Sequence, residues 1–210
     1  MQHQIPNGWM LLAAAGLIGL TAPASTQITI EARAGAQFSS ILVRDQINQE
    51  ITVGAKPAPS VGLAVGSSLN AMWHLGLGVR WSRSDLMRRE AGQESPILPL
   101  TVWTGTLALR RPLTNWAAVE ATIGGIKYAP GGDPDGTIFQ DDAPLLPAAG
   151  LTARANKGLG SRWAIGLEVA YDFHRFTTQA LRAADIREHR SVHRVAVSVV
   201  FRGNLTSATR

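Results

Sequence analysis

Few residues of this 210-residue chain combine the types and the spacing that catalysis requires. The best candidates are His189 and Ser191, which follow Glu188 and would share one face of a strand, because residues i and i+2 of a strand point the same way. A serine nucleophile needs a histidine base and an acid that orients the histidine. A polar junction between a loop and a strand explains the same residues more simply. We therefore expect no catalytic residues and no enzymatic activity.

A second candidate is the Gly- and Asp-rich stretch 131–136. Its Asp133, Asp135 and Gly136 match part of a calcium-binding loop. The remaining ligands do not follow at the required spacing, and no Glu ends the stretch. The chain has no cysteine and no zinc spacing, phosphate loop or nucleophile elbow. We therefore expect no metal site and no cofactor, and we interpret the stretch as a solvated acidic loop.

The remaining charged residues lie within segments that alternate apolar and polar residues. One segment covers 73–81 and another covers 163–173, and period two predicts a β-strand in each. Large apolar residues occupy one face, whereas Gly, Ala, Arg and Glu occupy the other. Small and paired polar groups suit a narrow interior. The apolar face is therefore expected to point outward into lipid.

The same pattern predicts eight strands of about ten residues, the length that a tilted transmembrane strand needs. They are expected at 27–38, 59–69, 71–82, 99–110, 116–128, 147–156, 162–174 and 191–202. The connections alternate between long (39–58, 83–98, 129–146 and 175–190) and short (68–70, 111–115 and 156–161). This layout is typical of an up-and-down barrel in the bacterial outer membrane, with short periplasmic turns and long external loops.

The N-terminus has the pattern of a signal peptide. Residues 10–20 are apolar but too few to span a bilayer, and Ala22-Pro23-Ala24 matches a cleavage site. No later segment has the continuous apolar run of a membrane-spanning helix. We expect a signal peptide at 1–24, a barrel at 25–202 and a C-terminal tail at 203–210.

These strands and connections resemble the small eight-stranded outer-membrane β-barrels of bacteria, the group that includes the transmembrane domain of outer membrane protein A and the OmpW- and OmpX-type barrels. The last expected strand also resembles the assembly signal of such barrels, with outward Val195, Val197 and Val199 and the aromatic Phe201. The resemblance implies an all-β fold, a closed antiparallel up-and-down eight-stranded transmembrane β-barrel. It also implies a monomer in the cell outer membrane, in contact with lipid and lipopolysaccharide and inserted by the barrel assembly machinery.

Alternation also predicts which charged side chains face the interior of the barrel. They are expected to form a lumen charge network of Glu31, Arg33, Arg80, Glu120, Arg154, Glu168, Asp172 and Arg194. Buried charges must pair, and the planar fork of arginine can engage two carboxylates. The network could line a gated pore, but an eight-stranded interior is just wide enough for side chains. We therefore favour a packed polar plug.

Aromatic residues fall near the ends of the expected strands. They are expected to form a girdle of Trp73, Trp81, Trp103, Trp163, Tyr171, Phe173 and Phe201 at the borders of a lipid-facing band. Packing in an ordinary protein core is the alternative interpretation of these aromatic residues. That alternative would require the charged face to be in contact with water.

The sequence leaves the biochemical role open. The formal net charge is +5, but the basic residues are scattered singly, so we expect no nucleic-acid partner. A structural or surface-interaction role is expected, with passage of a small or apolar molecule also open. One alternative is a lipid A-modifying enzyme, because lipid A deacylases are eight-stranded barrels with a His-x-Ser pair, although Arg190 and Val192 replace the residues that usually surround it. Another alternative is a soluble periplasmic ligand-binding barrel.

Overall fold

The computed structural model describes residues 27–46, 50–132, 138–139, 144–179, 181 and 190–205. The expected signal peptide at 1–24 lies outside these residues. Within them, no helix is long and apolar enough to cross a membrane. The strands are β1 (Ile28–Ser39), β2 (Ile41–Gln46), β3 (Glu50–Ala55), β4 (Ala58–Ser68), β5 (His74–Glu90), β6 (Gln93–Pro112), β7 (Ala117–Pro130), β8 (Leu145–Leu159), β9 (Trp163–Phe176) and β10 (Arg190–Leu205).

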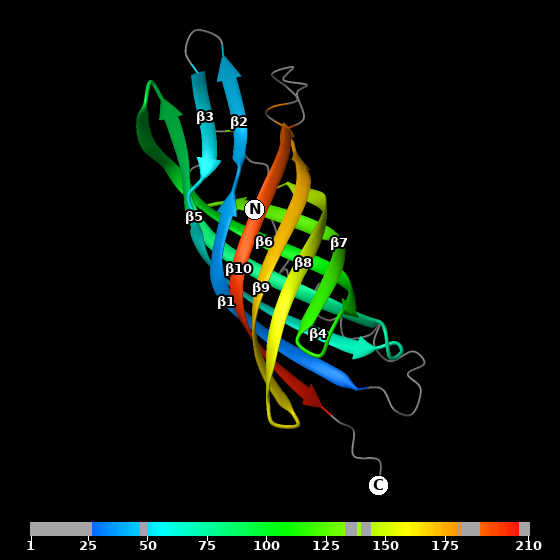
Figure 1. Ribbon diagram of the computed structural model, residues 1–210. Helices are drawn as coiled ribbons and strands as arrows, with labels where there is room; N and C mark the ends of the chain where they lie inside the picture. The colour runs from blue at the N-terminus through cyan, green and yellow to red at the C-terminus, as the bar shows by residue number, and fades with distance from the viewer. Residues whose placement is uncertain are drawn as a thin grey trace, which may run out of the picture.

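Eight of these strands form a closed antiparallel ring, in the order β1, β4, β5, β6, β7, β8, β9 and β10 (Figure 1). The first and last strands close it, with Ile28 opposite Leu205 and Ser39 opposite Arg194. Apart from this closing pair, ring neighbours follow one another in sequence, with β2 and β3 inserted between β1 and β4. The expected all-β, up-and-down, eight-stranded barrel is therefore confirmed.

Two of the four expected long loops, 39–58 and 83–98, were wrong, because strands continue through them. β2 and β3 form a hairpin in the first, and β5 and β6 extend through the second to a two-residue turn. Ala91 and Gly92 have φ angles of 48° and 80°, which suit a tight hairpin turn. β3 also pairs with β5, so β2, β3, β5 and β6 form a four-stranded sheet that projects beyond the ring (Figure 1). A strand in water carries polar residues on its outer face, so these strands lack the apolar outer face by which a lipid-facing strand is identified in the sequence.

The short connections lie together at the opposite end of the barrel, at 69–73, 113–116 and 160–162. Polar side chains stabilise two of them. Asn70 Oδ1 accepts hydrogen bonds from the backbone N–H of Met72 (2.8 Å) and of Trp73 (2.9 Å). Thr114 Oγ1 accepts one from the N–H of Ala117 (2.9 Å). These are the local side-chain bonds that favour turns, and the three short connections lie close to their expected positions.

The outer surface of the ring is apolar. In β9, odd-numbered residues are exposed and even-numbered residues are mostly buried along nearly the whole strand. Ile123, Leu151 and Leu167 have exposed fractions of 62%, 65% and 61%. Side chains of this kind rarely form a large exposed patch on a protein in water. The outer face therefore requires an apolar solvent.

Replacement of Leu167 by arginine tests this assignment of the outer face. We expect Leu167→Arg to lower the free energy of unfolding by about 2–4 kcal/mol, as for arginine near the bilayer midplane. Leu167→Phe is the control, because lipid accepts a larger apolar side chain whereas a packed core does not. Denaturant titration of the refolded protein in liposomes measures both. Equal loss of stability in the two variants would mean that Leu167 packs against protein.

Candidate functional site

The charged side chains of the ring converge inside the barrel near the short connections. Glu31 on β1 is 2% exposed and lies at the centre of this group. Its carboxylate accepts hydrogen bonds from Arg33 Nη2 (3.0 Å), Arg110 Nη1 (2.7 Å), Arg154 Nη1 (2.8 Å) and Arg202 Nε (3.1 Å). One carboxylate thus connects strands β1, β6, β8 and β10.

Glu168 on β9 is the second centre and is 1% exposed. Arg80 Nη2 lies 3.1 Å from its carboxylate and Arg33 Nε lies 3.5 Å away. Arg154 also donates to Glu168, so this arginine bridges the two centres. Arg80 in turn reaches Asp172, with Nη1 3.3 Å from Oδ2.

Glu120 on β7 completes the network. Its carboxylate accepts a hydrogen bond from Arg110 Nε at 2.9 Å and lies 3.9 Å from Arg33 and 3.8 Å from Arg154. Ion pairs therefore connect Glu31, Arg33, Arg80, Glu120, Arg154, Glu168 and Asp172. Of the expected lumen residues, Arg194 stands apart, because no carboxylate of the described residues lies within 4.0 Å of its guanidinium.

Sequence reasoning missed two members of the network, Arg110 and Arg202. Both could have been found by continuing the alternation to the ends of their strands. Trp103, Leu107 and Leu109 point outward on β6, so Arg110 points inward. Arg202 follows outward Phe201 at the last position of the expected barrel, and β10 continues beyond it to Leu205. With these two, six arginines face four carboxylates in the described lumen.

Small residues on one wall make room for the long arginine side chains. Gly62, Gly66, Gly76 and Gly78 lie on β4 and β5, and the last three line a cavity of about 20 Å³ beside Glu31. A second cavity of about 20 Å³ lies between Arg33, Arg80 and Asp172. Each has room for roughly one water molecule. The charged side chains thus fill this half of the lumen.

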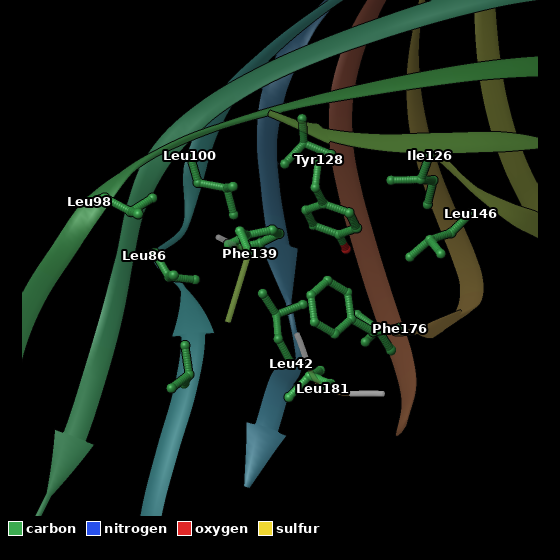
Figure 2. Close-up of a cluster of buried hydrophobic side chains, with 13 residues drawn as sticks. Leu42, Leu86, Leu98, Leu100, Ile126, Tyr128, Phe139, Leu146, Phe176 and Leu181 are labelled. Carbon is green, nitrogen blue, oxygen red and sulfur yellow. The ribbon is translucent and has the colours of Figure 1, made fainter. Parts of the chain in front are cut away.

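The other half of the lumen, toward the long connections, holds a cluster of buried apolar side chains (Figure 2). This apolar cluster consists of Leu42, Val53, Leu86, Leu98, Leu100, Val102, Ile126, Tyr128, Phe139, Leu146, Phe176, Leu181 and Val192. Phe139 packs against Tyr128 and Phe176, with ring centroids 6.2 Å and 5.7 Å apart. The sequence pattern predicted only small and charged residues inside, and this part of the interpretation was wrong. Phe139 and Leu181 come from connections, which fold inward onto apolar inner faces of the strands.

Buried polar residues lie between the charged network and the apolar cluster. Tyr128 Oη and His174 Nε2 form a hydrogen bond of 2.8 Å, and both residues are 1% exposed. Arg194 Nη1 donates to Thr104 Oγ1 at 3.2 Å. The lumen is therefore charged at one end and apolar at the other, with incompletely paired polar groups between.

The expected girdle residues lie on the outside of the barrel or in a connection. Trp163 stacks on Phe201 with ring centroids 5.1 Å apart, and Trp81 meets Trp103 edge-on at 6.5 Å. Tyr171 and Phe173 flank His193, with ring centroids 5.9 Å and 5.5 Å away. Trp73 lies in the short connection 69–73, and the guanidinium of Arg111 is 5.6 Å from its ring centroid. Trp116, which is 58% exposed at the same end, was not among the expected girdle residues.

The candidate catalytic and metal-binding residues form no site in the described part of the chain. Ser191 is exposed on the outer face of β10, and His189 lies outside the described residues. The acidic stretch around Asp133 and Asp135 also lies outside them. Among the described residues, no three His, Asp or Glu side chains are grouped to hold a metal ion.

Solved structures with this arrangement of strands come from bacterial outer membranes. Neisserial surface protein A (NspA) matches with a TM-score of 0.54 and 11% sequence identity, over 85% of this chain and 96% of that chain. OprG from Pseudomonas aeruginosa matches with a TM-score of 0.54 and 12% identity, over 88% of this chain and 97% of that chain. The outer membrane protein AlkL, solved in lipid bilayers, matches with a TM-score of 0.56 and 10% identity, over 100% of this chain and 99% of that chain. The chain therefore has the fold of the small outer-membrane β-barrels.

Comparisons of sequence add nothing to this structural likeness. No protein-family model matches the chain, and no curated protein matches it significantly. The chain thus shares its strand arrangement with these outer-membrane proteins, whereas the residues of its lumen are known only from their own contacts.

Removal of the Glu31 carboxylate tests whether the network stabilises the barrel. We expect Glu31→Gln to lower the free energy of unfolding by about 3–5 kcal/mol, because it leaves buried arginines without a full partner. The double variant Glu31→Gln/Arg154→Met should recover part of the loss, which a double-mutant cycle in denaturant measures.

Glu94→Gln is the matched control. Glu94 is exposed on the projecting hairpin, where a hydrogen bond from Arg89 lowers the pKa of its carboxyl group. Exposed pairs contribute little, so no measurable change is expected. A Glu31→Gln variant as stable as this control would show that the network does not hold the barrel together.

Proposed function

We propose that the protein is a non-enzymatic barrel of the bacterial outer membrane that takes up small apolar molecules into the outer half of its lumen. The observation that carries the proposal is the apolar cluster, which occupies the end of the lumen toward the long connections and continues along the projecting sheet. An interior that served only as a plug could be charged throughout, as it is at the other end. A buried apolar interior toward one side of the membrane is instead suited to apolar ligands.

Three observations support the location. The outer face of the ring is apolar, aromatic residues lie along its borders, and the solved neighbours are outer-membrane proteins. In this orientation the projecting sheet faces outside and the short connections face the periplasm. Export would use the signal peptide at 1–24, and the barrel assembly machinery would insert the chain next to lipid and lipopolysaccharide. One chain completes the ring, which favours a monomer.

The charged network closes the periplasmic half in this proposal. The two cavities near it have room for about one water each. In this proposal the described network leaves ions no continuous water-filled route, and we expect no steady conductance from the wild-type barrel. Apolar molecules that enter from outside would stop at the network.

A surface-interaction role is the second candidate, and the projecting sheet favours it. β2, β3, β5 and β6 extend beyond the ring and expose Arg88 and Arg89 to solvent. A lipid A-modifying enzyme has less support, because among the described residues no side-chain hydrogen bond links Ser191 to a histidine or a carboxylate. A soluble periplasmic barrel also has little support, because the outer face carries large apolar side chains.

Enlargement of the apolar cluster tests uptake. Phe139→Ala should raise the binding of the fluorescent apolar probe N-phenyl-1-naphthylamine, because an emptied apolar cavity stays dry and accepts apolar ligands. The same change should cost about 3–5 kcal/mol of stability. Fluorescence of the full chain in nanodiscs, measured against empty nanodiscs, gives the binding.

Phe173→Ala is the matched control, because Phe173 lies on the outer face and its removal opens no cavity in the lumen. Probe binding should be unchanged in this control. If the wild type and Phe139→Ala both bind no more probe than empty nanodiscs, the proposed uptake is incorrect.

Single cysteines test the location and orientation, since the chain has no cysteine of its own. Gln93 lies at the tip of the projecting sheet and Ser161 lies in a short connection. An impermeant maleimide applied to intact cells should label Gln93→Cys and leave Ser161→Cys unlabelled. Labelling of both, or of Ser161→Cys alone, would contradict this orientation.

A further inference from the structure

The level at which the lumen changes from charged to apolar contains a buried cation without a carboxylate partner. Arg194 is 2% exposed and donates a hydrogen bond to Thr104 Oγ1. No carboxylate of the described residues lies within 4.0 Å of its guanidinium. Asp172 is the cross-strand neighbour of Arg194 in the pairing of β9 with β10, but its carboxylate is beyond ion-pair distance of Arg194 and lies 3.3 Å from Arg80. A buried charge without a counter-ion is costly.

Two further polar atoms near this level have no hydrogen-bond partner. They are Nδ1 of His174 and Oε1 of Gln37, in side chains that are 1% and 5% exposed. His174 Nε2 is engaged by Tyr128 Oη, so Nδ1 remains free for another group. Buried polar atoms normally have partners. The level around Arg194 and His174 therefore has unused hydrogen-bonding capacity.

The apolar cluster begins directly beside these polar groups. Phe176 follows His174 by two residues on β9, and Val192 precedes Arg194 by two on β10. Residues two apart on a strand share a face, so these apolar side chains and the polar ones line the same lumen. Figure 2 shows Phe176 close to Tyr128 and Phe139 inside the cluster.

The charge of the lumen favours an anion at this level. Its described inner face has six arginines and four carboxylates. Arginine presents a planar fork of N–H donors that fits a carboxylate. A ligand whose head carries one negative charge would supply the partner that Arg194 lacks.

We propose that the lumen binds single-chain amphiphiles with an anionic head, such as long-chain carboxylic acids. The carboxylate is held at Arg194 and His174, and the apolar chain lies in the apolar cluster. This inference rests on the proposed uptake of apolar molecules and adds the chemical class of the ligand. Phe139 and Leu181 belong to connections, so a chain can take the volume that they fill without breaking any strand pairing.

The test compares ligands that share a tail and differ in the head. Dodecanoate, dodecan-1-ol and dodecyltrimethylammonium compete with N-phenyl-1-naphthylamine on the full chain in nanodiscs at pH 8. Dodecanoate should displace the probe at about 10-fold lower concentration than dodecan-1-ol, as expected for hydrogen bonds to a charged group. Dodecyltrimethylammonium should be the weakest competitor, and this comparison needs no variant.

Variants of single arginines then test where the head group of the ligand binds. Arg194→Met should abolish the preference for dodecanoate and leave displacement by dodecan-1-ol unchanged. Arg83→Met is the matched control, because Arg83 is exposed on the outside of β5, and the preference should survive in it. If Arg194→Met does not fold, Arg194→Lys keeps the charge but loses the fork, and its preference should be reduced.

The outcomes separate the inference from the proposed function. Equal displacement by the acid and the alcohol, or a preference that survives in Arg194→Met, would overturn the anionic head group while leaving apolar uptake in place. Failure of all three amphiphiles to displace the bound probe would overturn the inference alone. If the probe itself does not bind, uptake and inference both fail.

Discussion

The pairing of charges inside a closed ring is the constraint on which the rest of this structure depends. Once β1 pairs with β10, the inner face of every strand shares one narrow volume. A carboxylate in that volume has no bulk water, so its stability depends on guanidinium groups from other strands. Glu31 receives hydrogen bonds from arginines on β1, β6, β8 and β10, and Glu168 is paired with Arg33, Arg80 and Arg154. The network thus links strands that are not adjacent in the ring and therefore share no backbone hydrogen bonds.

The solvent outside the barrel explains why the inner face changes from polar to apolar along the strands. Over most of the ring the outer face is apolar, as at Leu167, and polar side chains occupy the interior. Beyond the level of His174 and Arg194 the interior is apolar instead, and the projecting sheet exposes Arg88 and Arg89. Apolar groups turn away from water and toward whatever excludes it. The inversion along a single strand is therefore consistent with passage of that strand from lipid into water.

The two halves of the lumen have different consequences for function. The charged half is filled by side chains that cannot leave without exposing unpaired charge. The apolar half is partly filled by Phe139 and Leu181, which are side chains of connections. Neither residue belongs to a strand, so displacement of their side chains leaves the strand pairing of the described residues intact. The interior therefore combines a charged network that closes one end of the lumen with an apolar volume at the other end that a ligand can occupy.

The sequence by itself determined the ring of eight strands, the outward apolar face and most of the inward charges, because alternation with period two is a local property of each strand. Arg110 and Arg202 could also have been found in this way, by extending the alternation to the strand ends. Three features were decided by the tertiary structure alone. The partners of Glu31 lie up to 171 positions away and depend on the stagger of strands around the ring. The continuation of β5 and β6 into a projecting sheet depends on their pairing with each other and on that of β5 with β3. The apolar cluster depends on which connections fold into the lumen. Alternation cannot show which face of a strand points inward, because apolar side chains point outward where lipid surrounds the strand and inward where water surrounds it.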